Sequence, residues 1–210
     1  MKKLGLVLMC MLLATTLFAV DVTIGGAIGP NTSFMSGSDW DDMIEAYDGS
    51  NEFRIGFEIG AFFDIAINEF FSIQPEINFL LLRAGAGNSD YDVEATATIY
   101  VLEIPVLAKF NLEAGNGIFS FFFGPSFQIL LGDPNITAEV GGTEVMNEDM
   151  SVDNSVLFAG VVGIGYAFPV GNGNLYFDLR YRRQFTTFDD DFNGKVNNIG
   201  LRIGYGITVR

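Results

Sequence analysis

The chain has 210 residues, enough for one sizeable domain, and no segment of it reads as a linker between two. Its 26 acidic and 11 basic residues give a formal net charge of −15, which makes nucleic acid and anionic lipid surfaces poor partners for the exposed surface. The absence of histidine excludes Ser-His lipases, Asp-His proteases and His-dependent acyl transferases, because each needs an imidazole. We therefore expect a protein that is not an enzyme and that holds no cofactor.

Residues 1–19, MKKLGLVLMCMLLATTLFA, combine two lysines, a long apolar run and a small residue at Ala19. This arrangement is typical of a secretory signal peptide, so we expect the mature protein to begin near Val20. An uncleaved anchor helix is the alternative, since the segment approaches the ~20 residues that span a membrane. Cys10 is the only cysteine, so the mature chain would contain no disulfide.

The rest of the chain shows the pattern of β structure. It is rich in apolar residues, with 21 Phe and 25 Gly, yet after residue 20 it has no apolar run of the ~18 residues needed for a membrane helix. Apolar and polar residues alternate instead, which favours strands. Eight stretches show this alternation: 21–30, 53–64, 70–83, 96–110, 118–131, 154–168, 175–185 and 197–209.

Each stretch has one apolar and one polar or small-residue face. The last stretch is an example: its odd-numbered positions from Ile199 to Val209 are apolar or aromatic, and Arg202 stands among glycines on the other face. Such strands are about the length of tilted membrane strands, ~9–11 residues. We expect the apolar face to contact lipid and the polar face to line an interior.

The connections alternate between long and short. Residues 31–52, 84–95, 132–153 and 186–196 are long and polar, whereas 65–69, 111–117 and 169–174 are short, with AGNG and VGNGN as turn sequences. Long loops at one end and tight turns at the other are typical of outer-membrane barrels, with both termini on the periplasmic side. The pattern predicts an all-β, eight-stranded antiparallel up-and-down transmembrane β-barrel.

Four segments carry a family resemblance: FSIQPEINF (71–79), YVLEIPVLAKF (100–110), FFFGPSF (121–127) and LRYRRQF (179–185). In these segments and their order the chain resembles the small porin-like, PorT-type family of outer-membrane β-barrels. The resemblance covers nearly all of the mature chain. It implies an eight-stranded barrel domain over residues 20–210 and an outer-membrane location, and it implies little about activity.

A soluble ligand-binding barrel of the lipocalin type is the structural alternative. That family's early Gly-x-Trp motif is missing, because the only tryptophan is Trp40, in a predicted loop. Turning the barrel inside out would also put Arg54, Glu58 and Arg202 in water and crowd the apolar side chains into an interior too small for them. The membrane barrel therefore fits the sequence better.

The inward faces carry charges of both signs. The predicted lumen residues are Arg54, Glu58, Glu76, Glu103, Lys109, Asp178, Arg180, Arg182 and Arg202. Because eight strands enclose a space only wide enough for side chains, and because an unpaired buried ion is costly, we expect these residues to form a charge-paired network that fills the lumen. A narrow ion path and a metal held by the three glutamates are the alternatives.

The predicted turn positions also suggest which charges are neighbours. A turn centred near residue 67 predicts Glu58 beside Glu76, and a loop centred near residue 89 predicts Glu76 beside Glu103. A loop centred near residue 191 predicts Arg180 beside Arg202. A wall of glutamates would then face a wall of arginines.

The long loops carry the surplus of acidic residues. In DDDFNG, Asp189, Asp191 and Asn193 have the spacing of the first half of a calcium loop, but no glutamate follows at the twelfth position, so a solvated acidic loop is the default. The segment SDWDDMIEAY (38–47) predicts a short helix whose Trp40 packs on the barrel rim or contacts a partner.

These features predict a structural or adhesive role. Trp40, Asp189, Asp191 and Asn193 are the candidate loop contacts, and the expected partners are membrane lipid, host or envelope proteins and, weakly, divalent cations. The alternative function is a narrow porin that passes ions or small solutes.

Overall fold

The computed structural model describes residues 21–46, 48–88, 90–188 and 193–209. The expected signal peptide at residues 1–19 lies outside this range, as do Asp189 and Asp191 of the candidate calcium loop. No helix in the described ranges is long and apolar enough to cross a membrane.

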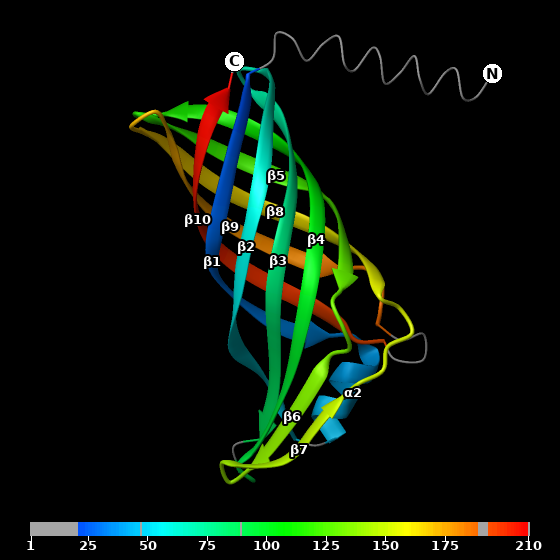
Figure 1. The fold of residues 1–210 in the computed structure, drawn as a ribbon. Helices are drawn as coiled ribbons and strands as arrows, with labels where there is room; N and C mark the ends of the chain where they lie inside the picture. Colours follow the sequence, from blue (N-terminus) through cyan, green and yellow to red (C-terminus); the bar gives the residue numbers. More distant parts are fainter. Residues whose placement is uncertain (1–20, 47, 89, 189–192, 210) are drawn as a thin grey trace, which may run out of the picture.

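Eight strands form a closed antiparallel ring, which confirms the predicted fold (Figure 1). Each strand pairs with its neighbours along the chain, and β1 closes the ring by pairing with both β2 and β10. The ring strands are β1 (Val22–Ser36), β2 (Ser50–Asn68), β3 (Phe71–Asn88), β4 (Val93–Ala114), β5 (Gly117–Leu130), β8 (Val156–Val170), β9 (Gly173–Gln184) and β10 (Lys195–Val209).

The alternation in the sequence appears in the structure as alternating exposure. In β10, Ile203 is 43% exposed whereas Arg202 is 2% exposed. The apolar side chains of the other ring strands are likewise exposed on the outside of the ring, and the polar ones are buried inside. So large an exposed apolar surface would be unfavourable in water, and it fits a barrel whose outer face contacts lipid.

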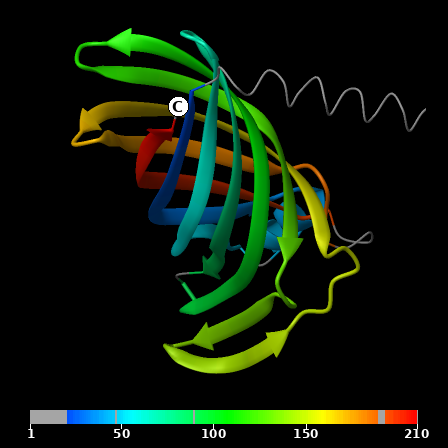
Figure 2. The same cartoon turned by 45° about the horizontal axis from the view of Figure 1, so that its top comes forward.

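The two ends of the barrel differ. One end carries the start of β1, the end of β10 and three two-residue connections, between β2 and β3, β4 and β5, and β8 and β9. Gly115 and Gly171 begin two of these turns with φ of 64° and 62°, a conformation that favours glycine. The opposite end carries α2 (Ser38–Ala46) and a further hairpin, β6 (Asn135–Val140) and β7 (Thr143–Asp149). Figure 2 shows this hairpin projecting beyond the ring.

The hairpin corrects the prediction of a polar loop at 132–153. β6 pairs with the extended end of β4, and β7 pairs with β6. Gly141 and Gly142, with φ of 58° and 72°, form the turn, as a two-residue hairpin of this type requires. The Gly-Gly pair was the available signal, but all seven residues of β7 are exposed, so the strand lacks the one-sided apolar pattern by which a half-buried strand is recognised.

The predicted loops 31–52 and 84–95 are also shorter than expected. β1, β3 and β4 continue beyond the predicted stretches, and the expected helix follows β1 as α2. Outside the membrane the outer face of a strand no longer contacts lipid, so that face need not be apolar. The strands therefore continue there without the alternation of apolar and polar residues.

Candidate functional site

The inward-facing polar side chains of the ring strands form the candidate site. The structure places all nine predicted lumen residues on this inner face, but it distributes them over four separate levels. The two central levels hold the arginines of β9 and β10 and the glutamates of β2, β3 and β4.

Glu76 is the centre of the first level. Its carboxylate accepts two hydrogen bonds from Arg180, at 2.9 and 3.3 Å, and two from Arg202, both at 3.2 Å. Asp178 also lies between the two arginines and accepts a hydrogen bond of 3.0 Å from each. Two guanidinium groups therefore face two carboxylates, and this cluster is electrically balanced in a buried environment.

Amides complete the coordination of Glu76. Gln74 and Asn78 donate to its two carboxylate oxygens at 2.6 and 2.9 Å. The guanidinium carbon of Arg180 also lies 5.1 Å from the ring centre of Phe122, a cation–π distance. Such saturation with donors is what allows a carboxylate to remain charged away from water.

Arg182 is the centre of the second level. Its Nε donates to Glu103 at 3.1 Å, and both terminal nitrogens donate to Glu58. Asn198 accepts a further hydrogen bond from Nη1 at 2.9 Å, and Gln128 donates to Glu103 at 3.3 Å. One arginine thus joins β9 to β2 and β4, across the inside of the barrel.

The third level lies nearer the end with the termini and includes an ion pair that the sequence analysis missed. Lys109 donates to Asp64 at 2.7 Å and to Gln74 at 3.0 Å, and its ammonium lies 5.3 Å from the ring centre of Tyr176. Asp64 has the same parity as Glu58 in β2, so the alternation would have placed it inside if the predicted stretch had been followed to its last residue. Lys109, Asp64 and Tyr176 border a cavity of about 280 Å³ at this mouth.

Arg54 does not join the central clusters. It lies at the opposite rim, partly exposed, where its Nη2 is 2.5 Å from both Glu52 and Glu94. Exposed pairs of this kind contribute only ~0–1 kcal/mol, so Arg54 is the least important of the nine predicted residues for lumen stability.

The predicted neighbour pairs are wrong in register. Glu58 lies opposite Leu80 instead of Glu76, and Asn78 rather than Glu76 lies opposite Glu103. Across β9 and β10, Arg202 faces Asp178 and not Arg180. Each error is an even number of residues, which changes the neighbour but keeps the side chain on the same face, because side chains alternate with a period of two.

An apolar layer that was not predicted from the sequence closes the lumen on the side of α2. Buried side chains from five ring strands meet there with Phe188 of the loop after β9. The members are Leu80, Leu82, Ile99, Val101, Leu130, Leu157, Phe188 and Val196, with Met35 and Val152 packed against them. The signal was the run Phe79–Leu82, where both faces of a strand are apolar, as in a strand buried on both sides.

The geometry argues against the metal alternative. Within the described ranges, no group of three or more carboxylates, cysteines or histidines could hold a metal ion. Glu58, Glu76 and Glu103 are held instead by guanidinium groups. The charged side chains of the interior therefore neutralise one another and connect strands across the lumen.

The loop candidates lie around α2. Trp40 is half-buried and donates from Nε1 to Asn51 at 3.0 Å. Asn193 is tied to the start of α2, with its backbone nitrogen 2.8 Å from Asp39 and its side-chain nitrogen 3.1 Å from Ser38. Trp40 therefore joins α2 to the start of β2, and Asn193 joins the segment before β10 to the start of α2.

A family model described as an outer membrane protein beta-barrel domain matches residues 18–190. Among solved structures, the outer membrane protein OprG from Pseudomonas aeruginosa is similar with a TM-score of 0.54 and 12% identity, over 91% of this chain and 97% of that one. Ail of Yersinia pestis has a TM-score of 0.47 and 14% identity, over 90% and 99% of the two chains. Neisserial surface protein A has 0.45 and 13%, over 88% and 95%. No curated protein matches the sequence. At these identities the similarity to OprG supports the fold and nothing finer.

Proposed function

Because this chain belongs to the outer membrane protein β-barrel domain family, we propose that it acts as a closed barrel in the outer membrane, with a structural or adhesive role. The observation that carries the proposal is the filling of the lumen. An apolar layer and two levels of buried ion pairs follow one another along the interior. A permeating ion would have to displace hydrogen-bonded, buried charges, which is costly.

The elements at the end opposite the termini supply the surface for contact. The β6–β7 hairpin projects from the ring, and its carboxylates at Glu144, Glu148 and Asp149 are exposed. This end faces the cell exterior when the termini are periplasmic. The partner class that fits such a surface is a cationic patch on a host or envelope protein, with divalent cations as weaker ligands.

The role we propose is not catalytic. Acid–base chemistry in the lumen would need a carboxylate or base that substrate can reach, and Glu58, Glu76 and Glu103 are buried among arginines. We also propose that the protein belongs to the PorT-type group of small barrels, on the four sequence segments that resemble it.

Single-channel recording in planar bilayers tests the closed lumen. The protein should give no steady current, because buried side chains occupy the apolar layer and the two central ion-pair levels. The alternative, a narrow porin, predicts discrete conductance steps. If such steps occur, Arg182→Ala should change the conductance of each step, because it removes the side chain that links Glu58 and Glu103. Arg54→Ala at the rim should leave the conductance unchanged.

Binding to immobilised cationic protein tests the adhesive role. A variant with Glu144→Gln, Glu148→Gln and Asp149→Asn should bind more weakly, because the exposed hairpin loses the charges that would pair with the cationic protein. The same replacement of Asp21, Glu69 and Glu113, which are exposed at the end with the termini, is the control for total charge. Equal loss in both variants would show that net charge alone, and not the hairpin, determines binding.

A further inference from the structure

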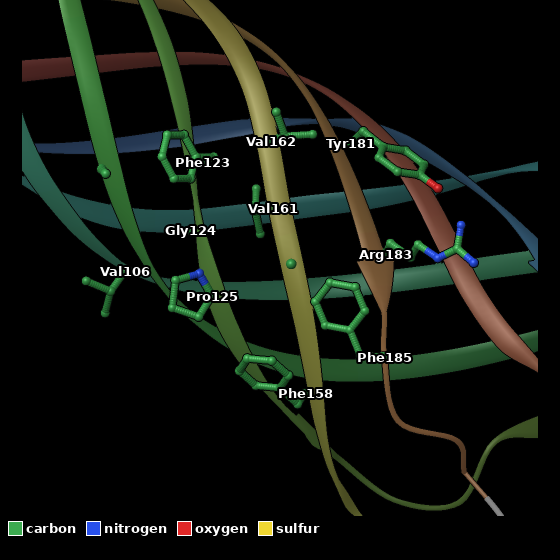
Figure 3. A pocket seen from close by; sticks show the side chains of 12 residues that line it. Val106, Phe123, Gly124, Pro125, Phe158, Val161, Val162, Tyr181, Arg183 and Phe185 are labelled. Carbon is green, nitrogen blue, oxygen red and sulfur yellow. The ribbon is translucent and has the colours of Figure 1, made fainter.

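The outer face of the barrel carries a groove of about 570 Å³ across β4, β5, β8 and β9 (Figure 3). Its walls are almost entirely apolar and include Val106, Phe123, Phe158, Val162 and Phe185. All five point away from the lumen, so the groove opens toward the lipid and not into the barrel. It is separate from the ion-pair levels described above.

Gly160 lines the groove without a side chain. It occupies an outward position of β8 between Phe158 and Val162, where neighbouring strands carry large side chains. The ring of Phe185 leans over it, and a Cβ on Gly160 would lie 2.8 Å from Cζ of that ring. Phe158 and Phe185 also contact each other, with ring centres 5.7 Å apart. The two rings form an aromatic wall beside a position that has no side chain.

A positive charge lines the groove. Along β9, from the end with the termini toward the loops, the outward residues Leu175, Phe177 and Leu179 are apolar. The first outward charge in this direction is Arg183. Arg183 lies opposite Asn197, which accepts a hydrogen bond of 2.6 Å from the hydroxyl of Tyr181. Arg183 also lies opposite Gly160 of β8, one residue before the end of β9, and the exposed rings of Phe158 and Phe185 follow on the side of the acidic loops. The cation is therefore set into the apolar wall, near the loop end of the strand.

Arg183 has no acidic partner among the described residues, since no carboxylate there lies within 4.0 Å of its guanidinium. An arginine on the lipid face is destabilising unless it reaches the interface or pairs with an anion. The chain as a whole is acidic, so a site for an anionic lipid needs its own local cation, and Arg183 supplies one.

We propose that this groove binds one acyl chain of a phosphorylated outer-leaflet lipid, with the lipid phosphate paired to Arg183. The apolar walls match a hydrocarbon chain, and the single cation in the wall, near the loop end of β9, matches the phosphate of such a lipid. A second copy of the protein is a poorer occupant, because the acidic ends of two parallel barrels would repel each other.

Native mass spectrometry of the full-length protein in a non-ionic detergent tests the proposal, with diphosphorylated lipid A as the probe. One lipid should remain bound. Gly160→Leu should weaken binding about tenfold or more by filling the groove, since the tip of the Phe185 ring can turn aside. Arg183→Gln should weaken it by a similar factor, because a charge-assisted pair is lost.

Two variants at matched positions are the controls. Gly26→Leu adds the same side chain at another outward glycine, and Arg83→Gln removes an outward arginine of β3. Both should bind as the unmodified protein does. Equal losses in the control variants, equal binding of lipid A without its phosphates, or a protein dimer that Gly160→Leu abolishes would each overturn the proposal. Circular dichroism of every variant verifies that the barrel has formed.

Discussion

Arg202 lies directly opposite Asp178 across β10 and β9, and Nη2 of the arginine is 3.0 Å from the carboxylate. The same guanidinium reaches Glu76 on the far wall of the lumen at 3.2 Å. A cross-strand neighbour and a long-range partner therefore share one cation. Arg202 of β10 therefore connects β9, on one side of the β1–β10 pair that closes the ring, with β3 on the other side.

Replacing Arg202 should destabilise the barrel. In Arg202→Met, Asp178 and Glu76 each lose a guanidinium partner inside the barrel, and we expect a loss of about 3 kcal/mol in the free energy of unfolding. Urea titration in phospholipid vesicles, followed by circular dichroism, measures it. Arg54→Met at the partly exposed rim is the control, with an expected loss of ~0–1 kcal/mol. An unchanged midpoint for Arg202→Met would contradict a stabilising network.

Gly200 should tolerate no side chain. A Cβ there would lie 2.1 Å from Oε1 of Glu58 and 2.9 Å from Nη1 of Arg182, so Gly200→Ala should displace the second level of the lumen. We expect a loss of about 1–3 kcal/mol in the same titration. At Gly26 the nearest atom would be 3.5 Å away, so Gly26→Ala should be within ~0.5 kcal/mol of the unmodified protein. Equal effects would mean that the inner face is less tightly packed than the structure indicates.

Two exposed apolar residues should respond differently to a charge. Leu201 on β10 is 55% exposed and Val145 on β7 is 62% exposed, but only Leu201 lies on the lipid-facing side of the ring. Leu201→Arg should cost about 2–4 kcal/mol near the middle of the membrane. Val145→Arg, on the projecting hairpin, should leave the unfolding free energy unchanged. A harmless Leu201→Arg would argue that this face contacts water.

The β6–β7 turn should depend on glycine. Gly142 has a φ of 72° and open space around its Cβ position, so Gly142→Val introduces backbone strain and no clash. We expect a local cost of about 1–2 kcal/mol and faster cleavage of the hairpin in limited proteolysis, while the barrel unfolds at the same urea concentration. Thr143→Val, at the next residue, is the control. Unchanged proteolysis of Gly142→Val would show that the hairpin does not need this turn.

The residues of the lumen show how far sequence reasoning reached. Arg180, Arg182 and Arg202 were assigned to the interior from the alternation alone, and the structure places them there. Asp64 was missed because the predicted stretch ended at its position. The pairing of Glu58 with Arg182 could not be predicted, because it joins strands that are not neighbours along the ring.

The sequence by itself determined the faces of the strands, the number of strands in the ring and the end at which the acidic loops lie. These follow from local rules, since a period of two and short Gly-Asn turns act over a few residues. Only the tertiary structure decided the register, the partners of each buried charge, the apolar layer around Phe188 and the groove beside Arg183. Those features depend on how the ring closes, which brings together side chains more than a hundred residues apart, as in the pair of Arg180 and Glu76.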